Sequence, residues 1–162
     1  MKLLLMRHGV AEDPIGYAPT HDFDRVLTKK GRKRIRRLGR ALRDIAVVPE
    51  LIVSSPLVRA VQTAEVLVAA LDSDQPVLVR RELAVGGDIY PVSQELAAMG
   101  VESALLVGHE PTLSIFAADR TNSDKWGGSF SKGMILALQI DEGNNAKALF
   151  SINTEQFEPI FL

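Results

Sequence analysis

Lys2-Leu3-Leu4-Leu5-Met6-Arg7-His8-Gly9 sets the architecture of this chain, because four apolar residues in a row precede an arginine, a histidine and a glycine. A short, unbroken apolar run closed by a glycine indicates a strand that is buried on both faces, as in a parallel sheet. We therefore predict a strand over Lys2–Met6 with Arg7-His8-Gly9 at its carboxyl end. The same kind of run recurs further along the chain, at Leu51–Val53, Pro76–Val79 and Ala104–Val107.

Segments of helical period separate these runs. Thr28 can cap a helix whose apolar positions follow at spacings of three, four and three residues, at Ile35, Leu38, Leu42 and Ile45. We expect Pro49 to end that helix and Pro56 to occupy the first position of the next one. A further helix is expected over Val92–Met99, and another begins at about Pro111.

Near the carboxyl terminus, the alternation of strands and helices gives way to two successive apolar runs, Met134–Ile140 and Ala146–Ile152. The turn-rich linker between them is typical of a hairpin. The order of elements predicts an α/β fold: a three-layer α/β/α sandwich with a mostly parallel central sheet and an antiparallel edge strand. No linker divides the chain, so we expect a single domain over residues 1–162.

Composition excludes several classes of protein. The chain has 162 residues, no cysteine and a formal net charge of -1. It therefore has no disulfide framework and no cysteine nucleophile, and its net charge gives no general attraction to nucleic acid or anionic lipid. The apolar run after Lys2 is too short for a secretory signal, and no run approaches the length of a membrane span. We expect a cytoplasmic protein with neither nucleic acid nor a membrane as its partner, either a monomer or a weak homodimer.

Reactive and anion-binding residues follow three of the four predicted early strands. Arg7 and His8 end the first, Ser54-Ser55-Pro56 with Arg59 ends the second, and His109 ends the fourth. In open α/β sheets ligands bind outside the carboxyl ends of the strands, so these side chains should meet at one rim. Two guanidinium groups match phosphate oxygens, and a neutral histidine is a competent phosphate acceptor. The pattern predicts phosphoryl transfer through a histidine.

Three blocks of this sequence carry a family resemblance. Leu5-Met6-Arg7-His8-Gly9 resembles the Arg-His-Gly signature of the histidine phosphatase (phosphoglycerate mutase-like) superfamily, and residues 54–64 and 107–111 resemble its second and third blocks. The short chain, Leu27-Thr28 to Gly31, and Glu82-Leu83 before Gly86-Gly87-Asp88 are similar to the SixA-type phosphohistidine phosphatases of that superfamily.

The resemblance implies a phosphoglycerate mutase-like fold and a phosphatase that needs neither cofactor nor metal. It implies that His8 is the phosphorylated nucleophile, that Arg7, Arg59 and His109 hold the phosphate, and that Gly9 contributes to substrate binding. Water would then hydrolyse phospho-His8, and the substrate would be a phosphohistidine-bearing protein.

The general acid is the open position in this assignment. Many members of the superfamily carry an acidic residue on an insertion between the second and third blocks, or directly after the second histidine. Here the candidates are Glu110, Glu82 and Asp88. A phosphohistidine substrate reduces the need for an acid, because imidazole is easier to expel than an alkoxide.

Two other functions remain open from the sequence. The same site can serve small phosphomonoesters. Alternatively, the chain is a non-catalytic binding module that uses the basic helix 29–43, which contains nine of the 19 lysines and arginines. The remaining histidine, His21, is expected in a solvated loop.

Overall fold

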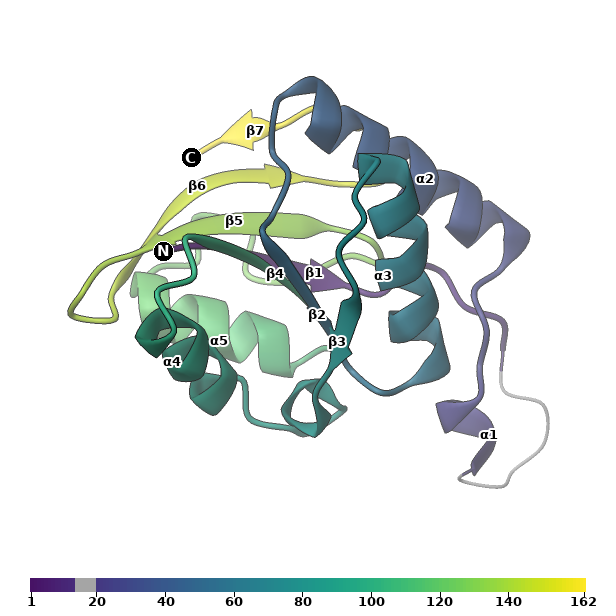
Figure 1. Ribbon diagram of the computed structural model, residues 1–162, viewed down its shortest axis with the longest axis horizontal. Helices are drawn as coiled ribbons and strands as arrows, with labels where there is room; N and C mark the ends of the chain where they lie inside the picture. Colours follow the sequence, from purple (N-terminus) through teal and green to yellow (C-terminus); the bar gives the residue numbers. More distant parts are fainter. Residues whose placement is uncertain (14–19) are drawn as a thin grey trace.

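The computed structural model describes residues 1–13 and 20–162, whose strands form one sheet in the order β3-β2-β4-β1-β5-β6-β7 (Figure 1). The strands are β1 (Lys2–Arg7), β2 (Leu51–Ser54), β3 (Val77–Val79), β4 (Ser103–Gly108), β5 (Ile135–Ile140), β6 (Ala146–Ile152) and β7 (Ile160–Phe161). The neighbouring pairs among β3, β2, β4 and β1 are parallel, and the pairs from β1 through β5 and β6 to β7 are antiparallel.

Helices cover both faces of this sheet, which gives the three layers that the sequence predicts. The helices are α1 (Thr20–Phe23), α2 (Lys29–Asp44), α3 (Val58–Leu71), α4 (Tyr90–Ala98) and α5 (Thr112–Thr121), with a 3-10 turn, η1 (Arg81–Leu83). In Figure 1, α2 and α3 lie on one side of the sheet and α4 and α5 on the other. None of the helices in the described ranges combines the length and apolar character that a bilayer span requires.

The apolar run in β1 is unbroken because both faces of the strand are covered. Leu3 and Leu5 pack into the core cluster formed with α4 and α5, whereas Leu4 and Met6 pack into the cluster formed with α2 and α3. All four side chains are fully buried. Since side chains alternate between the faces of a strand, every position of such a strand must be apolar.

The antiparallel part is broader than the single edge strand that we predicted. The expected hairpin is present as β5 and β6, but β5 pairs directly with β1 along Lys2–Met6, and β7 adds a third antiparallel strand. With only two residues, β7 is too short to leave a periodic pattern in the sequence.

The observed ends of α2 and α3 agree only in part with the predicted ones. The backbone N–H of Gly31 donates to Thr28 Oγ1 at 2.8 Å, which confirms the predicted cap of α2. However, α2 ends at Asp44, ahead of Pro49, and Ile45 is 38% exposed rather than part of the apolar face. The prediction that Pro56 begins α3 is also wrong, because the chain stays non-helical until Leu57, whose N–H donates to Ser55 Oγ at 3.3 Å.

The segment before α2 also differs from the prediction. His21 lies in the short helix α1 rather than in a loop, and its side chain lies outside the part of the chain that the structure describes.

Candidate active site

The side chains expected at one rim lie together at the carboxyl ends of β1, β2 and β4. Because β1 and β4 are parallel neighbours with Arg7 opposite Gly108, the histidines that follow them are brought side by side. The ring centroids of His8 and His109 are 5.1 Å apart. Arg59, from the first turn of α3, reaches the same point and contacts His8.

His8 is held in one tautomer by two contacts. Its Nδ1 lies 2.7 Å from the carbonyl oxygen of Gly9, which can only accept, so Nδ1 carries the proton. Arg59 Nε donates to His8 Nε2 at 3.3 Å, which requires a lone pair on that atom. Burial lowers the pKa of His8 to about 3, with the charges of His109, Arg59 and Arg7 acting in the same direction. The ring is therefore neutral at pH 7, with Nε2 as a potential nucleophile.

Arg59 has a second partner that the sequence did not indicate. Its Nη1 donates to the carbonyl oxygen of Asp22 at 2.6 Å, and its Nη2 lies 3.2 Å from Asp22 Oδ2. Partial burial would raise the pKa of Asp22, but bonds from Arg25 and Arg59 outweigh it and hold the pKa below its usual value. In this structure, Asp22 thus occupies the Nη1 and Nη2 donors of Arg59 that could otherwise bind a phosphate.

His109 presents a free ring nitrogen. Its Nε2 lies 2.8 Å from Ser55 Oγ, while its Nδ1 is buried and has no hydrogen-bond partner among the described residues. Since Ser55 Oγ already accepts from the N–H of Leu57, its own proton can go to Nε2, which leaves Nδ1 as the donor. Burial lowers the pKa of His109 to about 4, with the charge of Arg59 acting in the same direction.

Arg7 completes the group of cationic and histidine side chains. Its Nη1 donates to the carbonyl oxygen of Phe130 at 2.8 Å, and its Nε is buried without a partner in the described part of the chain. The segment that carries Phe130 is fixed to the end of β1, because the N–H of Gly133 lies 3.1 Å from the carbonyl oxygens of both Arg7 and His8. Arg7 and His109 therefore each have one unsatisfied buried nitrogen, which an oxyanion can satisfy.

Gly9 supports the site without a free donor. Its N–H donates to Thr63 Oγ1 at 3.0 Å, and that hydroxyl donates to the carbonyl oxygen of Arg59 at 2.7 Å. A Cβ at Gly9 would stand 3.0 Å from Ile35 Cγ1, so the close approach of α2 favours a glycine here. In this structure Gly9 holds His8 through its carbonyl rather than offering its N–H to a ligand.

All three candidate acids have other hydrogen-bond partners. Glu110 accepts from Ser114 Oγ at 2.6 Å and from the N–H of Phe130 at 2.5 Å. Glu82 pairs with Arg80 at 3.0 Å, and that bond holds its pKa below the usual value. Asp88 accepts from the N–H of Tyr90 at 3.0 Å.

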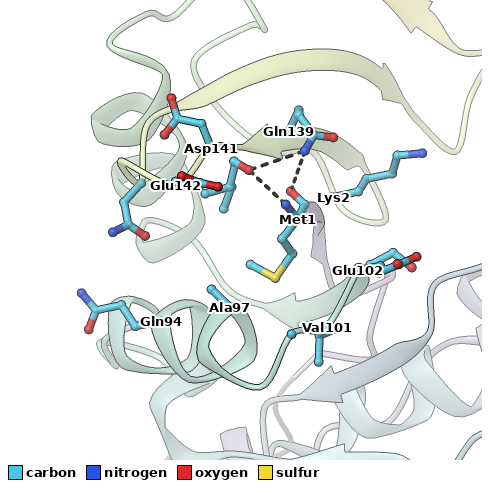
Figure 2. A pocket seen from close by; sticks show the side chains of 13 residues that line it. Met1, Lys2, Gln94, Ala97, Val101, Glu102, Gln139, Asp141 and Glu142 are labelled. Atoms are coloured by element: carbon cyan, nitrogen blue, oxygen red, sulfur yellow. Dashed lines mark hydrogen bonds between the residues drawn. The ribbon is translucent and has the colours of Figure 1, made fainter.

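A hollow of about 1050 Å³ opens at the other end of the sheet, where β1 and β4 begin (Figure 2). Met1, Glu102 and Gln139 lie on its wall, and the amino group of Met1 donates to the carbonyl oxygen of Ile140 at 3.0 Å. Neither arginine nor histidine lines this hollow, so it lacks the histidine and guanidinium groups that meet at the site between His8 and His109. Within residues 1–13 and 20–162, no group of three or more His, Asp and Glu side chains is placed to hold a metal ion.

Comparisons with known proteins agree with this geometry. Residues 3–84 match the model of the histidine phosphatase superfamily (branch 1). The chain is 30% identical to phosphohistidine phosphatase SixA of Escherichia coli (strain K12), over 90% of this chain and 89% of that protein. It is 36% identical to an uncharacterized protein of Picosynechococcus, over 72% of this chain and 71% of the other. A solved structure of the protein histidine phosphatase SixA complexed with tungstate matches with a TM-score of 0.86 and 27% identity, over 98% of this chain and 100% of that one.

Proposed function

Because this chain belongs to the histidine phosphatase superfamily and is a phosphatase, we propose that it hydrolyses a phosphohistidine carried by a protein, with His8 receiving the phosphoryl group. The observation that carries the proposal is the fixed tautomer of His8. Its Nδ1–H donates to Gly9 and its Nε2 lone pair faces Arg59, so the ring is a neutral nucleophile beside three groups that bind an oxyanion.

In the first step, His8 Nε2 forms a bond to phosphorus as the bond between phosphorus and the substrate's ring nitrogen breaks. Arg59 gives up its hydrogen bonds to His8 and Asp22 and donates to phosphate oxygens instead. Arg7 Nε and His109 Nδ1 donate to the other phosphate oxygens. A phosphohistidine that is protonated on its second ring nitrogen leaves as neutral imidazole, so the substrate supplies its own leaving-group proton. Phosphoryl transfer then requires mainly alignment and charge stabilisation.

In the second step, water attacks the phosphorus of phospho-His8 and the bond to Nε2 breaks. The phosphorylated ring is an imidazolium, because Nδ1 keeps the proton that it shares with Gly9. Cleavage therefore returns neutral His8 and releases phosphate with both protons of the water, and His8 is ready for the next substrate.

The partners of the acidic residues favour phosphohistidine over a phosphomonoester. An alkoxide leaving group needs a proton donor, and Glu110, Glu82 and Asp88 are each bonded to another part of the chain. Arg80 in addition stabilises the charged form of Glu82, which is the wrong form for an acid. The similarity to phosphohistidine phosphatase SixA of E. coli over 90% of this chain supports the same choice.

The test is dephosphorylation of a phosphohistidine-bearing protein by the wild type and by His8→Ala, with a chelator present and a panel of small phosphomonoesters alongside. We expect turnover of the protein substrate that His8→Ala abolishes and the chelator leaves intact. Rapid quenching should trap phosphate on His8 in an acid-labile, alkali-stable form. Turnover of phosphomonoesters with none of phosphohistidine would instead establish the small-molecule alternative.

A further inference from the structure

The outer face of α2 carries nine of the 19 lysines and arginines of the chain. Seven of its basic side chains are exposed and two are half-buried, at Lys29, Lys30, Arg32, Lys33, Arg34, Arg36, Arg37, Arg40 and Arg43. The opposite side of the helix is buried through Ile35, Leu38 and Leu42. Among the described residues, none of these nine cations lies within 4 Å of a carboxylate, since the ion pairs there involve only Arg25, Arg59 and Arg80.

This basic face is also hollowed. A groove of about 510 Å³ runs between α2 and the segment after β6, and its basic wall consists of Lys30, Lys33, Arg34 and Arg37. The guanidinium of Arg37 lies over the ring of Phe157, 4.1 Å from its centroid. Four cations and one carboxylate, Glu155, therefore border one concave surface, and its excess of positive charge suits a protruding acidic segment.

The basic face begins beside the active site. The N–H of Thr28 donates to the carbonyl oxygen of Val10 at 2.9 Å, two residues after His8, and Ile35 packs on Gly9. In Figure 1, α2 starts on the side of the molecule where the β1 arrow ends, and it runs back across the sheet from there. A helix of this length covers about 24 Å at 1.5 Å per residue, which is comparable to the width of a small protein partner.

We propose that the outer face of α2 is the docking surface for the acidic face of the protein that carries the phosphohistidine, an inference that rests on the proposed function. Complementary charge would steer such a protein to the site and hold it while its histidine reaches His8. The surface thus adds a substrate preference, for phosphohistidines surrounded by carboxylates.

The remaining charge and the aromatic residues disfavour other polyanions. The chain as a whole has a net charge of -1, so the positive charge of α2 is balanced by acidic surface elsewhere, which would repel a long nucleic acid. The ring of Phe157 lies under Arg37 and is partly buried against the core cluster of α2 and α3, which disfavours its use for base stacking.

The test compares two variants of equal charge change. Lys30→Glu/Lys33→Glu alters the groove, and a glutamate at position 30 is favourable in the first turn of α2, so the helix should remain folded. Lys125→Glu/Lys147→Glu changes two exposed lysines outside α2 and is the control. The substrates are a small phosphohistidine-carrier protein with carboxylates around its histidine, the same carrier with those carboxylates changed to amides, and phosphoramidate.

We expect the groove variant to lose about tenfold or more in kcat/KM toward the acidic carrier, mainly through KM, as loss of steering predicts. Its turnover of phosphoramidate, and the control variant on all substrates, should stay within about twofold of the wild type. The amide carrier should be a poor substrate for the wild type. The groove substitutions should cause no further loss of kcat/KM toward this carrier.

An equal loss in both variants, or no loss in the groove variant, would overturn the docking surface and leave the proposed function standing. Tighter binding of duplex DNA or phosphatidylserine vesicles than of the acidic carrier would overturn it too. Should the wild type hydrolyse neither the carrier nor phosphoramidate, the proposed function fails, and calorimetric binding of the acidic carrier to the wild type and the groove variant decides the docking surface by itself.

Discussion

Arg59 donates a hydrogen bond from Nε to Nε2 of His8 at 3.3 Å, so a cation covers the lone pair that the proposed reaction uses. The contact keeps His8 neutral and oriented before substrate arrives. An incoming phosphate replaces it, because its oxygens are stronger acceptors for a guanidinium than an imidazole nitrogen. In the proposed mechanism, the free protein therefore holds its nucleophile, His8, in contact with Arg59, the side chain that binds the phosphate.

Arg59→Lys tests this arrangement. A lysine keeps the charge but cannot contact His8, Asp22 and a phosphate with a planar fork of donors. We expect kcat/KM to fall by about 10²-fold, corresponding to the loss of about 3 kcal/mol of charge-assisted hydrogen bonding. Arg80→Lys is the matched control, since Arg80 is half-buried and its ion-pair partners among the described residues are the surface side chains Glu82 and Glu95. A loss of similar size in the control would contradict the prediction.

Asp22→Asn should tighten the binding of phosphate. The carboxylate of Asp22 competes with a bound anion for Nη2 of Arg59, and its charge repels that anion. Because the side chain is 49% exposed, the expected effect is small, about two- to fivefold in the inhibition constant of inorganic phosphate. Asp24→Asn removes an exposed charge two residues away and should leave that constant unchanged. Weaker phosphate binding in Asp22→Asn would mean that Asp22 chiefly positions Arg59.

The contrast between Arg59 and Asp22 marks what the sequence can predict. The apolar runs gave the parallel strands, and parallel strands necessarily place Arg7, His8 and His109 at one edge. Asp22 belongs to a short helix in a connection without periodicity, and its contact with Arg59 depends on the path of the chain between β1 and α2.

Backbone contacts are equally hidden from sequence analysis. Arg7 donates to the backbone carbonyl oxygen of Phe130. Every residue type carries this group, so no pattern of side chains in the sequence predicts the contact. The start of α3 was predicted wrongly for a related reason. The hydroxyl of Ser55 accepts from the N–H of Leu57 and also bonds to His109 Nε2, and these two contacts favour a non-helical turn beyond Pro56.

Glu110 is predicted to position Arg7 rather than to donate a proton. Its carboxylate accepts from the N–H of Phe130, whose carbonyl oxygen accepts from Arg7. We expect Glu110→Gln to lose less than about fivefold in kcat, because the amide oxygen can still accept, and Glu110→Ala to lose about tenfold. Ser114→Ala, which removes the other contact of Glu110, should stay within about twofold of the wild type. The readout is kcat on phosphomonoesters whose leaving groups differ in pKa. A loss in Glu110→Gln that grows as the leaving group worsens would identify Glu110 as the general acid.

The two buried histidines should make the fold sensitive to acid. Burial lowers the pKa of His8 to about 3 and of His109 to about 4, whereas both titrate near 6.5 in the unfolded chain. Between these values the unfolded chain binds more protons, so the free energy of unfolding falls as the pH drops below 6.5 and levels off above it. From pH 7.5 to 5 the loss is up to about 2 kcal/mol for each histidine.

Urea unfolding of the wild type, His8→Gln and His109→Gln at pH 7.5 and pH 5 measures this effect. Each substitution lowers stability at both pH values through lost contacts, but it removes one titrating group, so the drop between the two pH values should shrink by up to about 2 kcal/mol. Carboxylates titrate alike in all three proteins and cancel in the comparison. Equal drops in the wild type and both variants would show that the two rings titrate near 6.5 in the folded state as well, so that both are protonated at pH 5. In that case His8 Nε2 would have no lone pair at pH 5, and kcat/KM would fall below pH 6.5 instead of persisting toward pH 4.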